Sequence, residues 1–128
     1  MRKVIVNMKN YIFADAIAQS LQTDPRSDFT VQRTTSTEEL LQYSNLCEPY
    51  AVLMEVNGYP PYVLAERLII RDEVKKVNPD CKIVLVVDEN SEKEVAAQVR
   101  QAKKDGRIDQ FIYGSISANY LVALMDTL

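Results

Sequence analysis

Short apolar runs alternate along the chain with longer segments in which apolar residues recur every three or four positions. The apolar runs predict five strands, at about 3–8, 29–33, 51–56, 82–87 and 108–113. The longer segments predict five helices, at about 11–23, 36–46, 62–77, 91–104 and 117–128, the first with Phe13, Ile17 and Leu21 on one face. With right-handed crossovers, this strict alternation gives a doubly wound α/β domain, a parallel sheet with helices on both faces.

Polar residues indicate where two of these helices begin. Ser36 with Glu39, and Ser91 with Glu94, have the spacing of a capping box, in which the serine hydroxyl accepts a hydrogen bond from a backbone N–H of the first turn. We therefore expect one helix to begin at Ser36 and another at Ser91.

Charge and hydropathy exclude several classes of protein. The 128 residues are 47% apolar and carry a net charge of −3, and no run of Lys and Arg exceeds two residues. We therefore expect one domain with no nucleic-acid surface of its own, since phosphate binding needs a clustered basic face. The apolar runs are too short to span a membrane, and no apolar signal-peptide core follows Met1-Arg2-Lys3. The sequence favours a cytoplasmic location.

The residues that usually carry chemistry are few. The chain has no histidine, which excludes Ser-His-Asp and Cys-His nucleophiles, histidine-based zinc sites and histidine phosphotransfer. Cys47 and Cys81 lack a CxxC spacing, so we expect reduced structural thiols.

The third predicted strand ends in a carboxylate. The run 51–56 is apolar on both faces, as in a parallel strand covered by helices, and chemistry in such sheets lies at the carboxyl ends of the strands. Glu55 lies at that end. Together with Asn7 and Asp88 it suggests a weak metal site, but we favour the alternative that Asp88 lies in a solvated turn before the next helix.

The run from Pro49 to Asn57, the proline shortly after it, the length and the five units resemble the receiver domain of bacterial two-component response regulators. The stretch 21–31 is similar to the same region of receivers that precede helix-turn-helix output domains. The resemblance covers the whole chain. It implies a flavodoxin-like sheet with strand order 2-1-3-4-5, and a receiver domain over residues 1–128 that forms the N-terminal part of a longer regulator.

Receivers of this family accept a phosphoryl group from a histidine kinase onto an aspartate that ends the third strand. An acidic pair after the first strand binds Mg²⁺ together with that aspartate, and a Thr or Ser and a Lys contact the phosphoryl oxygens. Position by position, the resemblance places the acceptor on Glu55, the acidic pair on Asn7 and Met8, the Thr or Ser on Val87 and the Lys on Gly114.

These substitutions predict a pseudo-receiver. Mg²⁺ requires hard oxygen ligands, and electrostatic neutralisation provides most of the catalysis of phosphoryl transfer, but only Glu55 offers a charge here. We expect no enzymatic activity, no metal and no cofactor. We expect regulation by protein contact instead, and the partner is an attached, DNA-binding output, a second copy of the chain, or a sensor kinase or other signalling protein.

Three alternatives remain open at this point. The longer Glu55 side chain either mimics a phosphoryl group or, as we favour, is held by backbone N–H groups of the following loop. In the second alternative, the chain is a working receiver that is phosphorylated on Glu55 or Asp88 by an unusual route. In the third alternative it is a flavodoxin-like module for a small ligand, although no Gly-rich phosphate loop is present.

Further expectations concern the surface. Phe111 occupies the position of an aromatic residue that switches between two orientations in receivers, with a plain half-buried aromatic as the favoured alternative. The third helix carries Arg67, Arg71, Lys75 and Lys76 among acids, which predicts a solvated face laced with salt bridges. A possible dimer face comprises Tyr113, Tyr120, Val122 and Met125. In the alternative, Met125 belongs to an inward stripe with Leu121, Leu124 and Leu128, and Tyr120 only flanks it.

Overall fold

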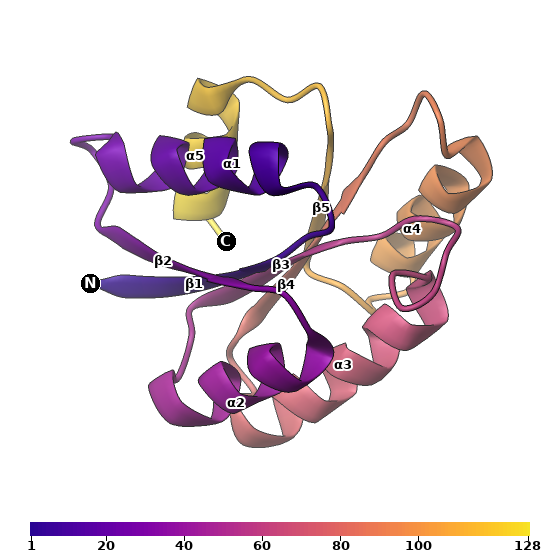
Figure 1. The fold of residues 1–128 in the computed structure, drawn as a ribbon, viewed down its shortest axis with the longest axis horizontal. Helices are drawn as coiled ribbons and strands as arrows, with labels where there is room; N and C mark the ends of the chain where they lie inside the picture. Colours follow the sequence, from indigo (N-terminus) through magenta and orange to yellow (C-terminus); the bar gives the residue numbers. More distant parts are fainter.

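The computed structural model describes residues 1–128, which form five strands and five helices in strict alternation (Figure 1). The strands are β1 (Arg2–Asn7), β2 (Phe29–Thr34), β3 (Ala51–Glu55), β4 (Lys82–Val87) and β5 (Gln110–Tyr113). The helices are α1 (Tyr11–Thr23), α2 (Thr37–Cys47), α3 (Leu64–Val77), α4 (Lys93–Lys104) and α5 (Ala118–Asp126).

The sheet is entirely parallel, with the strand order β2-β1-β3-β4-β5. Helices α1 and α5 cover one face, and α2, α3 and α4 cover the other (Figure 1). The predicted doubly wound, flavodoxin-like fold is therefore confirmed. None of the helices combines the length and the apolar character needed to cross a lipid bilayer.

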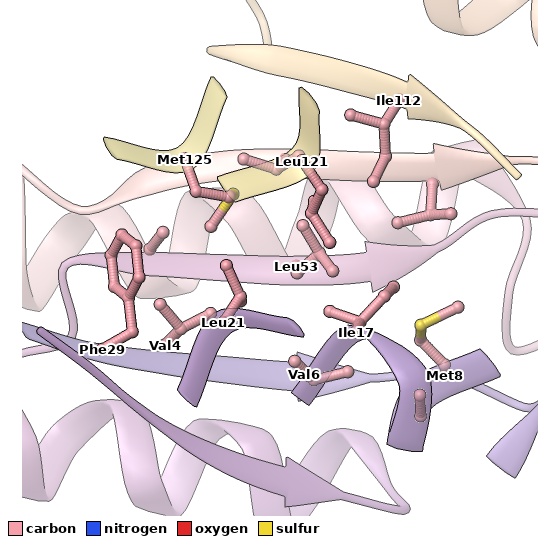
Figure 2. Packing of buried hydrophobic residues seen from close by; sticks show 14 of the residues in the cluster. Val4, Val6, Met8, Ile17, Leu21, Phe29, Leu53, Ile112, Leu121 and Met125 are labelled. Carbon is pink, nitrogen blue, oxygen red and sulfur yellow. The ribbon is translucent and has the colours of Figure 1, made fainter. Parts of the chain in front are cut away.

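Two hydrophobic clusters, one on each face, hold the layers together. Successive side chains of a strand point to opposite faces, so Val4 and Val6 enter one cluster while Ile5 enters the other. The cluster beneath α1 and α5 includes Ile17, Leu21, Phe29, Leu121 and Met125 (Figure 2).

The beginning of α4 differs from the prediction. We expected Ser91 to cap this helix, but α4 begins at Lys93, and its first turn receives no side-chain hydrogen bond. Asp88 Oδ1 instead accepts hydrogen bonds from the backbone N–H groups of Asn90 (3.0 Å) and Ser91 (3.3 Å), which makes a turn before the helix begins. At α2 the prediction is confirmed, because Ser36 accepts from the Glu39 N–H over 3.1 Å.

The register of the strands decides which residues meet at the carboxyl edge of the sheet. Asn7 lies beside Met54 in the β1–β3 pair, and Glu55 lies beside Val86 in the β3–β4 pair. The ends of β1, β3, β4 and β5 therefore converge at this edge, and the loops that follow them enclose it.

Candidate functional site

A cavity of about 930 Å³ opens at the carboxyl edge of the sheet. Met8, Glu55, Val87 and Gly114 line it, so the structure brings together four of the five positions that the sequence assigned to a degenerate phosphoryl and metal pocket. Asn7, the fifth, does not line the cavity.

Glu55 holds two loops together. Its Oε1 atom accepts hydrogen bonds from the backbone N–H groups of Lys9 (3.0 Å) and Asn10 (3.2 Å), just before α1. Its Oε2 atom accepts from the Asn57 side chain over 3.1 Å. The carboxylate is thus held by backbone N–H groups, as favoured from the sequence, but these groups belong to the loop after β1 rather than to the loop that follows Glu55.

Asn7 is buried, and its amide is engaged away from the cavity. The Nδ2 atom donates to Thr34 Oγ1 over 3.0 Å and to the Ser36 carbonyl over 3.1 Å, while Oδ1 accepts from Arg67 Nη2 over 3.0 Å. The one amide oxygen that could have served as a metal ligand at this position already has an internal donor.

The prediction that Arg67 lies on a solvated face of α3 was wrong, because the residue is buried. Its side chain is only 1% exposed, because it lies on the inward stripe of the helix with Ile70 and Val74. Nε donates to the carbonyl oxygen of Glu55 over 2.7 Å, and Nη2 approaches both the carbonyl (3.3 Å) and Oδ1 (3.0 Å) of Asn7. Sequence reasoning missed this residue, although its spacing from Ile70 and Val74 is that of a core position.

Arg67 is a buried cation without a salt bridge. Burial lowers its pKa to about 10, against the opposing effects of Tyr62, Glu55 and Glu66, so the guanidinium is charged at neutral pH. The guanidinium lies 4.8 Å from the centroid of the Tyr62 ring, in a cation–π contact. Of the other predicted residues on α3, Lys76 forms a surface pair with Glu73 at 3.0 Å, whereas Lys75 forms a partly buried pair with Asp109 at 3.1 Å.

The other pocket positions provide little polar chemistry. Met8 and Val87 are buried and apolar, and Gly114 faces open space, since a Cβ atom built on it would meet nothing within 4 Å. The Asp88 carboxylate accepts backbone hydrogen bonds from Asn90 and Ser91, and these lower its pKa. Asp88 therefore belongs to a turn, as favoured from the sequence. Nowhere in the chain do three or more His, Cys, Asp or Glu side chains lie close enough to hold a metal ion.

The structure removes two of the four residues from the proposed dimer face. Tyr120 is 61% exposed and Tyr113 is half-buried, but Val122 and Met125 are core residues with 5% and 0% exposure. Assigning Val122 and Met125 to a surface was wrong, because they share the inward stripe of α5 with Leu121 (Figure 2 shows Leu121 and Met125 inside the core).

Phe111 and Tyr113 on β5 pack edge to face, with ring centroids 5.6 Å apart. Phe111 is half-buried against the cluster beneath α2, α3 and α4, and the hydroxyl of Tyr113 accepts from Arg100 over 3.0 Å. The favoured interpretation of Phe111 as a half-buried aromatic is confirmed, and its role as a switch stays a prediction.

Comparison with known proteins identifies the fold. No protein-family model matches the sequence, and no curated protein matches it. Among solved structures, the chain is similar to a response regulator receiver domain protein from Methanospirillum hungatei, with a TM-score of 0.75, 12% identity, and coverage of 99% of this chain and 92% of that one. A LuxR-family DNA-binding response regulator from Staphylococcus aureus has a TM-score of 0.75 and 14% identity, with 99% and 98% covered.

A third similar structure is that of a response regulator from Thermotoga maritima in complex with Mg²⁺ and BeF, with a TM-score of 0.73, 16% identity, and coverage of 99% and 98%. These three neighbours are two response regulators and one receiver domain protein, and at such low identities the likeness concerns the fold. The strand order, the five helices and these neighbours together give this chain the receiver fold of response regulators.

Proposed function

We propose that this chain is a receiver-like signalling domain that controls an effector by protein contact and is not phosphorylated. The single observation that carries the proposal is that the oxygen atoms of the site serve contacts inside the chain. The carboxylate of Glu55 accepts three hydrogen bonds from within the chain, and Asn7 Oδ1 accepts a fourth from Arg67. The oxygen atoms at these two positions therefore serve contacts inside the chain, and Asn7 is turned away from the cavity.

The electrostatics of the cavity support the same proposal. The lining carries the carboxylates of Glu55, Asp88, Glu89 and Glu92 but only one cationic side chain, Lys9. A transferring phosphoryl group is stabilised by cations, and an excess of uncompensated carboxylates repels it. Arg67 does not reverse this balance, because its donors are directed to carbonyl and amide oxygens away from the cavity.

The effector in this proposal is a DNA-binding output domain, with residues 1–128 as the N-terminal domain of a longer regulator. The resemblance of stretch 21–31 to receivers with helix-turn-helix outputs supports it, as does the likeness to a LuxR-family DNA-binding response regulator. The proposed partner is one of four proteins: a second copy of the chain, the effector, a sensor kinase or another signalling protein. The half-buried and exposed tyrosines, Tyr113 and Tyr120, are the proposed contact residues.

The test is incubation with acetyl phosphate and Mg²⁺, followed by intact-mass measurement. A receiver with an aspartate acceptor, treated in the same way, is the positive control. We expect that the control gains one phosphoryl mass and that this chain gains none. A stable gain would overturn the proposal and favour phosphorylation by an unusual route, and Glu55→Gln and Asp88→Asn variants would then identify the acceptor.

A further inference from the structure

The cavity at the carboxyl edge contains carboxylates that form no salt bridge, and Lys9 is the one cationic side chain in its lining. Glu89 and Glu92 both line it, and neither takes part in a salt bridge. Glu89 Oε1 accepts a hydrogen bond from Ser115 Oγ over 2.8 Å, whereas Oε2 is shielded from solvent and has no hydrogen-bond partner. A buried carboxylate oxygen without a donor is costly, so this atom indicates a missing donor.

Apolar side chains form part of the remaining lining, beside polar ones such as Asn10, Asn57 and Ser91. The apolar ones include the buried side chains of Met8, Val56 and Val86. Ile12 and Tyr59, which also line the cavity, expose 84% and 69% of their surface. A ligand that covers these side chains would gain by removing them from water.

The size of the cavity limits the ligand. About 930 Å³ lies within the roughly 300–1,000 Å³ typical of small-molecule pockets. A bare metal ion would leave most of this space empty, and the carboxylates are not gathered closely enough to coordinate one. An anion such as a nucleotide phosphate would meet Glu89 and Glu92 and be repelled.

From these observations we infer that the cavity binds an organic cation with an apolar body, whose ammonium or guanidinium group donates to the carboxylates of Glu89 and Glu92 while its body packs against Phe13 and Tyr59. The inference rests on the proposed function in one respect: the cavity is free for such a ligand because phosphoryl transfer does not use it. The ligand would then be the signal, or part of the partner. Its two possible sources are a free amine or guanidine and an arginine side chain of a partner protein.

The test is a titration of the ¹⁵N-labelled domain, followed by two-dimensional NMR. The probe is 2-phenylethylguanidinium, and 2-phenylethanol is the neutral control with the same apolar body. We expect the amide signals of Asn90, Gly114 and Ser115 to move with the cation, at an affinity at least about tenfold higher than for the alcohol.

Matched variants assign the charge. Glu89→Gln and Glu92→Gln each weaken binding of the cation by about tenfold, whereas Asp80→Asn, at an exposed acid in the α3–β4 loop, leaves it unchanged. If Glu89→Gln does not fold, Glu92→Gln still provides the test. Equal affinity for cation and alcohol, or equal binding by all three variants, would overturn the inference.

A second titration distinguishes the two sources. The peptide acetyl-Leu-Arg-Leu-amide is compared with its citrulline analogue, which is neutral and nearly isosteric. Tighter binding of the arginine peptide than of the small cation supports a partner's arginine, and the reverse order supports a free ligand. If neither cation binds, the inference fails, and the phosphorylation test of the proposed function is unaffected.

Discussion

Arg67 Nε donates a hydrogen bond to the carbonyl oxygen of Glu55 over 2.7 Å, and Nη2 of the same guanidinium donates to Asn7 Oδ1 over 3.0 Å. One side chain of α3 thereby joins the last residues of two neighbouring strands, β1 and β3. Hydrogen bonds from a charged donor are stronger than neutral ones, and this offsets part of the cost of burying the cation. The guanidinium of Arg67 therefore stabilises the carboxyl edge of the sheet from the side covered by α3.

Removing this cation is expected to destabilise the fold. Arg67→Met leaves the carbonyl of Glu55 and the amide oxygen of Asn7 without their donor in a buried place, which we expect to lower the free energy of unfolding by about 2–4 kcal/mol. Urea denaturation measures the change. Lys76→Met on the same helix is the control, because its pair with Glu73 is at the surface and contributes less than about 1 kcal/mol. Equal losses in the two variants would contradict the role of Arg67.

Glu55 is expected to order the loop before α1. Glu55→Leu removes the acceptor for the N–H groups of Lys9 and Asn10, so we expect their amide hydrogens to exchange about tenfold faster, as a loss of about 1.4 kcal/mol of local protection would give. Hydrogen exchange followed by NMR measures it. Glu66→Gln, at a carboxylate with no hydrogen bond in the structure, serves as the control. Unchanged exchange at Lys9 and Asn10 would show that the loop does not depend on Glu55.

The fold followed from the sequence because each strand carries its own pattern. A short run such as Ile83–Val87, apolar on both faces, is typical of a covered parallel strand, and most of the other strands show a similar apolar pattern. The ends of elements were less predictable. The sequence placed a helix start at Ser91, but the Asp88 carboxylate claims the Ser91 N–H, and α4 begins two residues later. Where this turn ends and the helix begins depends on backbone geometry, which a spacing rule does not contain.

The candidate site was predictable only in its placement. Parallel strands bring their carboxyl ends together, so Glu55 and Gly114 had to meet at one edge. The direction of the Asn7 side chain was not predictable, since it depends on Thr34 and Arg67, which are distant in sequence. The burial of Arg67 was missed because charge was given more weight than its position on the stripe with Ile70.

Asp109 is expected to make stability depend on pH in the acid range. Burial alone would raise its pKa, but the Ile83 N–H (2.7 Å) and Lys75 Nζ (3.1 Å) stabilise the carboxylate and hold the pKa below 3.8. The pKa of Asp109 is lower in the folded state than in the unfolded state. The contribution of its carboxylate to the free energy of unfolding is therefore complete above the unfolded-state pKa near 3.8, and it is lost as the pH falls through the folded-state pKa.

Urea denaturation of the wild type and of Asp109→Asn between pH 7 and pH 3 tests this dependence. We expect the wild type to be more stable by about 1 kcal/mol at pH 7, and the difference to shrink as Asp109 becomes protonated. A difference that stays constant down to pH 3 would show that the charge of Asp109 is not what matters.

The two cysteines are expected to differ in reactivity. Cys81 is 2% exposed, and burial raises the pKa of its thiol to about 12. Burial also raises the pKa of the half-buried Cys47 thiol, which is still open to solvent. Because the thiolate is the reactive form, we expect a disulfide reagent at pH 8 to modify Cys47 slowly and Cys81 only after denaturation. Cys47→Ser should abolish the reaction of the native protein, and persistent native reactivity in that variant would contradict the burial of Cys81.

The proposed dimer face is expected to depend on Tyr120 rather than on Met125. A groove of about 520 Å³ runs along β5 and α5, lined by Phe111, Ile116 and Tyr120 among others, and Tyr120 is 61% exposed. Because aromatic residues are enriched in the centres of interfaces, we expect Tyr120→Glu to convert a concentration-dependent dimer into a monomer without loss of stability. Met125→Glu would instead place a charge in the core and unfold the domain, so it is unsuitable as a test of the interface.

Light scattering across a concentration series measures the mass of each variant. Ile69→Glu is the matched control, because Ile69 is 62% exposed but lies on α3, on the opposite face of the sheet (Figure 1). Dissociation by Ile69→Glu but not by Tyr120→Glu would move the interface to α3. If the wild type stays monomeric at every concentration, the groove beside β5 does not bind a second copy of the chain. Contact with an effector would then be its proposed use.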